Sequence, residues 1–425
     1  MSKHTISDLY QMQSLPLSAK IRMTQNRIRA WYDHWDGNVY VSFSGGKDST
    51  VLLDIARKLY PNIKAMFVDV PTQYPELRQF VKTFDNVDII RPKMNFFQTC
   101  EKYGFPLFSK EVSECVQGAR KYLTSLIEEG TVLTDRQTDR QTDRQTDRQT
   151  DRPYKYWYDR VCGQGIYAKP ERGGTTESIV DYEALANLLN ERMKNRKGGN
   201  NQRLAIMLGM FTNDKENPIK ATVPSKDRSQ FSMEHFKFML DAPFEISNRC
   251  CNVMKKEPAH RYAKETGLKP ITAQMASESK LRTQVWLKNG CNAFDIGNPI
   301  SNPMSFWTDQ DVLRYIKDYN LPICSVYGEV VSDDEEMGQM QLADYEGMEM
   351  FDIGRQMLHC TGCKRTGCVL CGFGTHLNAE KDRFTDLRKT HPKMYALLDV
   401  CKNNGYTMRQ AIDWIAEHSN KVIRY

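Results

Sequence analysis

Residues 44–49, with the sequence Ser-Gly-Gly-Lys-Asp-Ser, constrain the fold more than any other part of the chain. They follow a β-rich run at 39–43 and precede a helical pattern with apolar residues at 51, 52, 55, 56 and 59. The two glycines let the backbone turn sharply and approach a ligand closely. The first amides of the following helix and its positive dipole end suit a phosphate. We therefore expect a phosphate-binding loop between a strand and a helix.

The side chains of this loop fit that interpretation. Lys47 supplies a positive charge, and Ser44 and Ser49 supply hydroxyl donors. The loop is not a Walker A loop, because Asp48 follows the lysine and Val41 stands where the first glycine should be. It also lacks the glycine spacing of a dinucleotide-binding loop. A plain turn between strand and helix is the alternative, and the full hexamer in this setting favours the phosphate loop.

The strand and helix patterns alternate along the first part of the chain. Apolar runs at 63–68 and 87–90 predict a second and a third strand, and 271–273 predicts another strand after the turn at Gly267. Strands that alternate with helices predict a parallel sheet with right-handed crossovers. The sequence therefore indicates an α/β fold.

Two helices outside this alternation have clear signals. Residues 17–35 predict a basic amphipathic helix, with Ile28 and Trp31 on one face and Lys20 among the basic residues on the rest. Thr308 looks like the N-cap of another helix, with Asp309 and Asp311 in its first turn. The tail from 376 onward is mostly helical in pattern.

Composition and low-complexity segments suggest the domain organisation. The chain has 425 residues and a net charge of +6, and no run of 18 apolar residues, so we expect no membrane contact and a cytoplasmic location. We expect an N-terminal helical segment at 1–38, a nucleotide-binding α/β domain at 39–300 and a helical C-terminal region at 301–425. Residues 130–200 form a polar insertion that includes the Thr-Asp-Arg-Gln repeat at 134–152, more consistent with an expanded loop than with a partner-binding arm. The acidic stretch at 329–352 predicts a solvated loop.

Cysteines are clustered near the C-terminal end. Four of them, Cys360, Cys363, Cys368 and Cys371, fall within twelve residues that also contain several glycines. Four thiolates suit zinc or an iron–sulfur cluster. The central spacing of four residues is much shorter than the usual zinc-ribbon spacer of about 15–20, which favours iron–sulfur and leaves zinc as the alternative.

The hexamer at 44–49 resembles the PP-loop of ATP pyrophosphatases and phosphoadenosine-phosphosulfate (PAPS) reductases. Residues 67–69 (Phe-Val-Asp) look like the family's second strand, and 302–322 is similar to its Asn-Pro, Trp, Asp-Val, Tyr-Ile and Leu-Pro pattern. The resemblance is closest to a phage- and bacteria-borne, reductase-like branch. It implies a Rossmann-like sheet with helices on both faces that binds ATP, PAPS or adenylyl sulfate (APS), with Mg²⁺ for ATP. Asp69 lies about 20 residues past the loop, where an acidic group can reach a ribose.

A second basic segment extends the resemblance. Arg249-Cys250-Cys251, Lys255, Ser279 and Arg282 are similar to the reductases' cysteine pair and to the stretch that grips their phosphates, although Met275 replaces one arginine. The resemblance implies a [4Fe-4S] cluster on three firm ligands and an open fourth. The firm ligands are Cys363, Cys368 and Cys371, and the fourth is one of Cys360, Cys250 and Cys251.

Taken together, the loop and the resemblance assign roles to individual residues. The expected catalytic residues are Lys47, Asp48, Ser49 and Arg282. The expected nucleotide-binding residues are Ser44, Gly45, Gly46, Lys47, Ser49, Asp69, Lys255, Ser279 and Arg282.

Three functions follow from these assignments. The favoured one is an ATP pyrophosphatase that adenylates an acceptor, with a nucleic acid as one possible acceptor, for sulfur or nitrogen transfer from a sulfur-donor protein. The second is a PAPS or APS reductase that uses a partner's thiol, because we find no C-terminal Glu-Cys-Gly-type motif of thiol-based reductases, and the last cysteine, Cys401, lies in Asp-Val-Cys-Lys-Asn. The third is a nucleotide-sensing regulator that acts beside a ParB-like protein and contacts nucleic acid through helix 17–35 and the basic pair Lys364-Arg365.

Overall fold

The computed structural model describes residues 4–128, 182–195, 199–214, 218–224, 227, 232–332, 357–377 and 383–419. The Thr-Asp-Arg-Gln repeat and most of the acidic stretch at 329–352 lie outside these residues. The chain divides into two compact units, each built from two separate stretches. Unit 1 comprises Met1–Asn95 and Val253–Val369, and unit 2 comprises Phe96–Asn252 and Leu370–Tyr425. The domain boundaries expected at 38 and 300 stay predictions.

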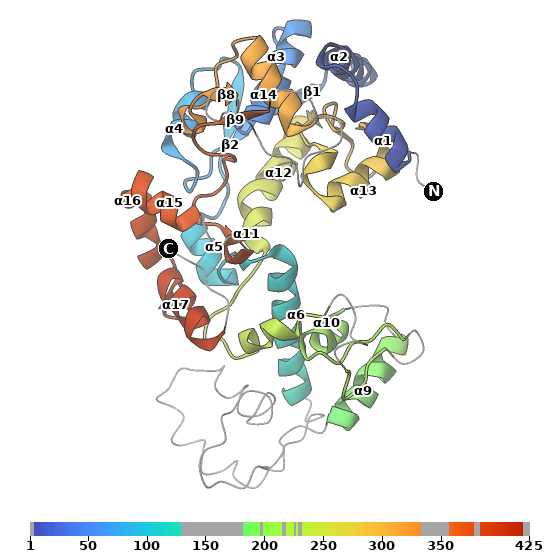
Figure 1. Ribbon diagram of the computed structural model, residues 1–425, viewed down its shortest axis with the longest axis vertical. Coiled ribbons are helices and arrows are strands. Elements are labelled where there is room, and N and C mark those ends of the chain that lie inside the picture. The colour runs from blue at the N-terminus through green and yellow to red at the C-terminus, as the bar shows by residue number, and fades with distance from the viewer. Residues whose placement is uncertain are drawn as a thin grey trace. The chain divides into compact units, whose positions relative to one another are not determined.

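Unit 1 is built on a six-stranded sheet (Figure 1). The strand order is β3-β2-β1-β5-β7-β6, and every neighbouring pair is parallel except β6 with β7. The strands are β1 (Val39–Ser42), β2 (Lys64–Val68), β3 (Val87–Ile90), β5 (Lys269–Ile271), β6 (Asn292–Ala293) and β7 (Ile300–Ser301). The predicted α/β fold with a parallel sheet is confirmed. Because β1 pairs with β2 on one side and β5 on the other, the strand order reverses at β1, where open α/β sheets bind their ligands.

Helices cover both faces of this sheet (Figure 1). On one face, α12 (Glu257–Thr266) packs Tyr262 against Tyr40 and Met66. Residues that alternate with these in the strands point to the opposite face. There α3 (Lys47–Leu59) follows β1 and packs against α2 (Leu17–His34) and α14 (Asp309–Asp318). The helices thus place the start of α3 at the carboxyl end of the central strand.

The helix predicted at 17–35 is α2, and Ile28 and Trp31 on it are fully buried, as expected. The placement of Lys20 on a polar face is wrong. Its side chain is 1% exposed and its Nζ lies 2.6 Å from Oδ2 of Asp311 on α14. The apolar stripe of α2 therefore includes one lysine, because a buried carboxylate on another helix neutralises it.

The N-cap predicted at Thr308 is confirmed. Its hydroxyl accepts from the Asp311 N–H, and the Asp311 side chain accepts from the Thr308 N–H, so the two residues form a capping box. Unit 1 also contains α1 (Ile6–Gln13), α4 (Pro75–Val81), α13 (Lys280–Asn289), the 3₁₀ helix η8 (Ser325–Tyr327) and the antiparallel pair β8 (Val330–Ser332) and β9 (Leu358–Cys360).

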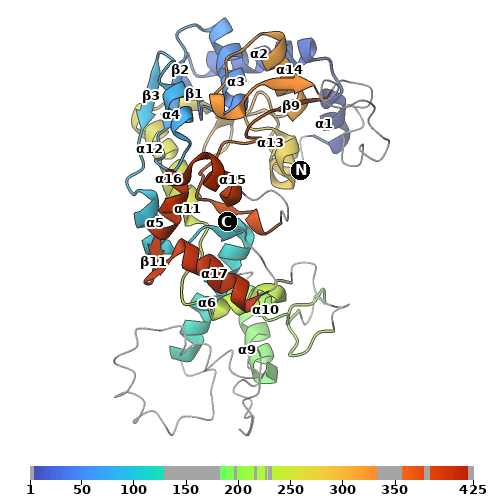
Figure 2. The same ribbon diagram turned by 60° about the vertical axis from the view of Figure 1, so that its left-hand side comes forward.

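Unit 2 is largely helical, and Figure 2 shows its C-terminal helices in red. Its core includes the fully buried Phe105, Phe108 and Phe244. The predicted helical tail is confirmed for the described residues. The elements of unit 2 are α5 (Phe96–Tyr103), β4 (Leu107–Phe108), α6 (Lys110–Glu128), α9 (Tyr182–Asn195), α10 (Asn200–Met207), η5 (Glu234–Leu240), α11 (Arg249–Cys251), β10 (Gly372–Phe373), η11 (Thr375–Leu377), α15 (Arg383–Thr390), α16 (Pro392–Tyr395), η12 (Ala396–Asp399), β11 (Lys402–Asn403), β12 (Tyr406–Thr407) and α17 (Met408–His418).

None of the helices in the described residues is both long enough and apolar enough to cross a membrane.

Candidate functional site

The loop at 44–49 has the geometry that its glycines predict. Gly45 has a φ of +73°, which side chains rarely adopt, and an added Cβ would lie 2.8 Å from Cγ2 of Val81 on α4. Gly46 is the N-cap of α3 and has no side chain of its own to cap that end of the helix. The start of α3 therefore presents backbone N–H groups at the carboxyl end of β1, the arrangement in which helices bind anions.

The loop serines bond to the loop itself. The Ser44 and Ser49 hydroxyl oxygens lie 3.0 Å apart, and the Ser44 N–H donates to Ser49 Oγ at 3.2 Å. The Ser49 hydroxyl donates to the Gly46 carbonyl at 2.9 Å, and the Gly46 N–H donates to Ser44 Oγ at 3.3 Å. These bonds fix the path of the backbone, so the two serines act first as supports of the loop.

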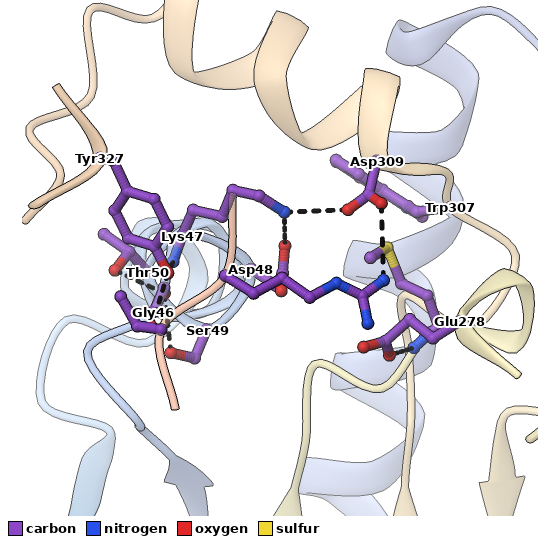
Figure 3. Close-up of polar contacts among 12 residues, drawn as sticks. Gly46, Lys47, Asp48, Ser49, Thr50, Glu278, Trp307, Asp309 and Tyr327 are labelled. Carbon is purple, nitrogen blue, oxygen red and sulfur yellow. Dashed lines mark hydrogen bonds and ion pairs between the residues drawn. The ribbon is translucent and has the colours of Figure 1, made fainter. Parts of the chain in front are cut away.

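Lys47 is buried at the first position of α3, between two carboxylates (Figure 3). Its Nζ lies 2.8 Å from Oδ1 of Asp48 and 2.9 Å from Oδ1 of Asp309. Burial pulls the pKa of Lys47 down, but the charges and hydrogen bonds of the two carboxylates outweigh it and raise the pKa above its ordinary value. Asp48 and Asp309 together therefore hold Lys47 as a cation. Of the two, Asp309 was predicted only as an acidic residue in the first turn of a helix.

Tyr327 and Thr366 are two further members of the site that sequence reasoning missed. The Lys47 N–H donates to the Tyr327 hydroxyl at 3.2 Å, and that hydroxyl lies 2.7 Å from Oγ1 of Thr366. Tyr327 is 2% exposed and stands at the end of η8. The three residues are separated by 280 and 39 positions in the chain, so no local pattern could have joined them.

Arginines add positive charge near the loop. Arg365 Nη2 lies 3.9 Å from Oδ2 of Asp309, and Arg282 forms an ion pair with Glu278. Burial and the charge of Arg365 lower the pKa of Arg282, and the charge of Asp48 opposes this shift. The catalytic and nucleotide-binding roles expected of Arg282 stay predictions.

Three other predicted nucleotide-binding residues lie outside the loop. Ser279 and Asp69 bond to other residues of the protein, and Lys255 lies in a separate helical turn. Ser279 is exposed, and its hydroxyl caps α13 by accepting from the Arg282 N–H at 3.3 Å. Asp69 is buried at the end of β2, and both its oxygens accept from Arg78, at 2.6 and 2.9 Å. Lys255 is half-buried in a π-helical turn, Asn252–Lys256. Their roles in binding a nucleotide stay predictions.

The predicted cysteine ligands are divided between the two units. Cys360, Cys363 and Cys368 belong to unit 1, and Cys250, Cys251 and Cys371 belong to unit 2. Cys360 ends β9, and Cys363 is fixed by a bond from its N–H to the Val326 carbonyl at 2.8 Å. Within the described residues, no three His, Cys, Asp or Glu side chains form a group that could hold a metal ion. The iron–sulfur and zinc alternatives therefore stay predictions.

The fold and the loop together define an α/β protein in which a helix N-terminus and a buried lysine follow the central strand β1. A sequence model described as "Phosphoadenosine phosphosulfate reductase domain" matches residues 38–125 and 211–373, more than half of the chain. The chain belongs to this family, as the sequence predicted, which supports the prediction that it is an enzyme.

Individual curated relatives match a smaller part of the chain than the family model does. The chain is 27% identical over 123 residues to adenosine 5'-phosphosulfate reductases from two strains of Pseudomonas aeruginosa, LESB58 and UCBPP-PA14. Each of these matches covers 27% of this chain and 45% of the relative. It is 32% identical over 87 residues to an uncharacterized protein of Methanocaldococcus jannaschii, covering 19% of this chain and 21% of that one. The chain thus spans less than half the length of these curated relatives.

Among solved structures, a PAPS reductase from Candida auris in a phosphate complex matches with 12% identity and a TM-score of 0.30. The overlap covers 75% of this chain and 87% of that one.

Proposed function

We propose that the chain binds ATP with Mg²⁺ at the loop 44–49, cleaves it to AMP and pyrophosphate, and adenylates an acceptor for sulfur or nitrogen transfer. The observation that carries this proposal is the convergence of two carboxylates, Asp48 and Asp309, on the Nζ of Lys47. The same two oxygens offer hard ligands to a divalent cation.

The charge balance favours a nucleotide that brings a cation with it. Asp48 and Asp309 pair with Lys47, and Arg365 pairs with Asp309, so these four residues offer a bare polyanion no net positive charge. An ATP molecule that carries Mg²⁺ makes this charge arrangement favourable, because both carboxylates then face a positive ion. Adenylyl sulfates need no metal for their chemistry and would gain nothing from the second carboxylate.

The residues of the chain have separate tasks in this reaction. Asp48 and Asp309 would hold Mg²⁺, which supplies Lewis-acid polarisation of the phosphates when bound. Lys47 and the first amides of α3 stabilise the negative charge that develops on the leaving pyrophosphate. The acceptor oxygen forms a bond to the α-phosphorus as the α–β bridge breaks, and the acceptor's proton leaves to solvent. A nucleophilic sulfur or nitrogen then displaces AMP.

Anaerobic incubation with α-³²P-ATP and Mg²⁺, followed by chromatography, tests this proposal. Water replaces the natural acceptor, so we expect slow release of AMP and pyrophosphate. Lys47→Ala and Asp309→Asn should each lower this rate by about tenfold or more. Lys47→Ala removes the cation that stabilises the leaving pyrophosphate, and Asp309→Asn removes a carboxylate that would hold Mg²⁺. Asp318→Asn is the matched control, since Asp318 is an exposed carboxylate at the far end of α14. ATP that stays intact with the wild-type chain would contradict the proposal.

A second candidate is reduction of an adenylyl sulfate, and the names of the family and of the Pseudomonas relatives favour it. Two thiols would supply two electrons, so that the sulfonucleotide gives AMP and sulfite while the thiols become a disulfide. Cys401 is fully buried and is therefore a poor thiol donor, and this candidate takes its thiols from a partner. Release of labelled sulfite from ³⁵S-adenylyl sulfate with a dithiol, in the absence of AMP formation from ATP, would favour this candidate over the first.

A further inference from the structure

The first amide of α3 already has a partner. Helix N-termini bind phosphate through their unpaired N–H groups, and Lys47 N–H is the first of these in α3. In this structure it donates to the hydroxyl oxygen of Tyr327 at 3.2 Å. A phosphate that uses this amide must take it from the tyrosine.

Thr366 holds the tyrosine in that place. Its Oγ1 lies 2.7 Å from the Tyr327 hydroxyl, so the tyrosine can accept from Lys47 and donate to Thr366 at once. Both oxygens lie against the loop, since a Cβ added to Gly46 would be 3.2 Å from the Tyr327 oxygen and 3.3 Å from Thr366 Oγ1. The pair therefore lies directly against the loop at Gly46, beside the first amide of α3.

The backbone around the pair is fixed by other bonds. The Gly362 N–H donates to the Tyr327 carbonyl at 2.9 Å, and the Cys363 N–H donates to the Val326 carbonyl at 2.8 Å. Removing either hydroxyl would leave these bonds intact. The hydroxyls are thus free to act on the loop without being needed to hold the two segments together.

We propose that Tyr327 and Thr366 control access to the phosphate loop, with the Tyr327 hydroxyl competing with the nucleotide's phosphate for the Lys47 amide and Thr366 positioning that hydroxyl. This inference rests on the proposed function of the loop as a nucleotide phosphate site. Thr366 lies between Cys363 and Cys368, so the segment that carries predicted cysteine ligands also carries one half of this contact.

Calorimetric titration of the full chain with ATP and Mg²⁺, and with pyrophosphate and Mg²⁺, tests the competition. Tyr327→Phe removes the competing oxygen, and we expect the dissociation constant of both ligands to fall by about three- to tenfold, the worth of one hydrogen bond. Thr366→Val should lower it in the same direction by less. The double variant should bind no more tightly than Tyr327→Phe alone, because Thr366 acts through the tyrosine.

Two further variants separate positioning from general structural damage. Thr366→Ser keeps the hydroxyl and should bind like the wild type. Thr361→Val is the matched control, because its hydroxyl accepts from the Glu329 N–H at 3.0 Å in the same segment and does not contact the loop. Affinity that is unchanged or weaker in Tyr327→Phe, with the thermal midpoint of unfolding unaltered, would overturn the inference.

Lys47→Ala distinguishes this failure from a failure of the proposed function. If the wild type binds ATP, Lys47→Ala abolishes binding and Tyr327→Phe changes nothing, only the present inference falls. If neither the wild type nor Tyr327→Phe binds either ligand, the inference and the proposed function fall together.

Discussion

Replacing Lys20 with Met tests the buried ion pair that joins α2 to α14. The Lys20 and Asp311 side chains are 1% and 7% exposed, and the two charged atoms lie 2.6 Å apart. Met keeps most of the aliphatic volume and removes the ammonium, which leaves a buried carboxylate without its cation. Removing one partner of a buried pair destabilises proteins by about 3–5 kcal/mol. Asp311 keeps its bonds from the Thr308 N–H and hydroxyl, so we expect the lower end, about 3 kcal/mol.

Urea unfolding followed by tryptophan fluorescence measures this change, because Trp31 and Trp307 are buried in unit 1. Lys64→Met is the matched control: its ion pair with Asp88 is 3.4 Å long, with side chains 47% and 39% exposed. Such a surface pair contributes about 0–1 kcal/mol. Adding Asp311→Asn to Lys20→Met should restore part of the lost free energy of unfolding, since it removes the uncompensated charge. A loss in Lys20→Met no larger than that in the Lys64 control would refute the reasoning.

Two other predictions concern the loop and the sheet. Gly45→Ala should lower the free energy of unfolding by more than Gly405→Ala does. Gly405 has a similar φ of +82° but open space around it, whereas a Cβ at Gly45 would also contact Val81. The φ strain alone is about 1–2 kcal/mol in both variants, and equal losses in chemical denaturation would contradict the prediction. Burial raises the pKa of Tyr40 to about 12, so the unfolded chain ionises this group first. The free energy of unfolding should therefore fall as pH rises from about 10 to about 12, and the fall should be smaller in Tyr40→Phe.

The elements that the sequence predicted well are those with strong local signals. The strand at 87–90 and the capping box at Thr308 are found where expected, because each is specified within a few residues. β5 begins two residues before the predicted strand at 271–273, since Pro270 weakened the local pattern without preventing parallel pairing with β1. The two-residue strands β6 and β7 are too short to give any periodic signal.

The parts of the site that sequence reasoning missed depend on contacts between distant residues. Asp309 reaches Lys47 across 262 positions, and Lys20 reaches Asp311 across 291. An acidic residue in the first turn of a helix is ordinarily explained by the helix dipole, so Asp309 gave no sign of a second role. At Asp69 the sequence suggested a role in binding that the structure gives to an ion pair. The position suits a ribose contact, but Arg78 pairs with both oxygens of the carboxylate.

The central claim is that Lys47, Asp48 and Asp309 form a site for a nucleotide that carries Mg²⁺. Its most direct test is calorimetric titration of the full chain with ATP, first with Mg²⁺ and then with EDTA, in the wild type and in Asp309→Asn. We expect Mg²⁺ to tighten ATP binding to the wild type by about tenfold or more, through two carboxylate ligands, and this gain to shrink in Asp309→Asn. Equal affinity for ATP with and without Mg²⁺ in the wild type would contradict the claim.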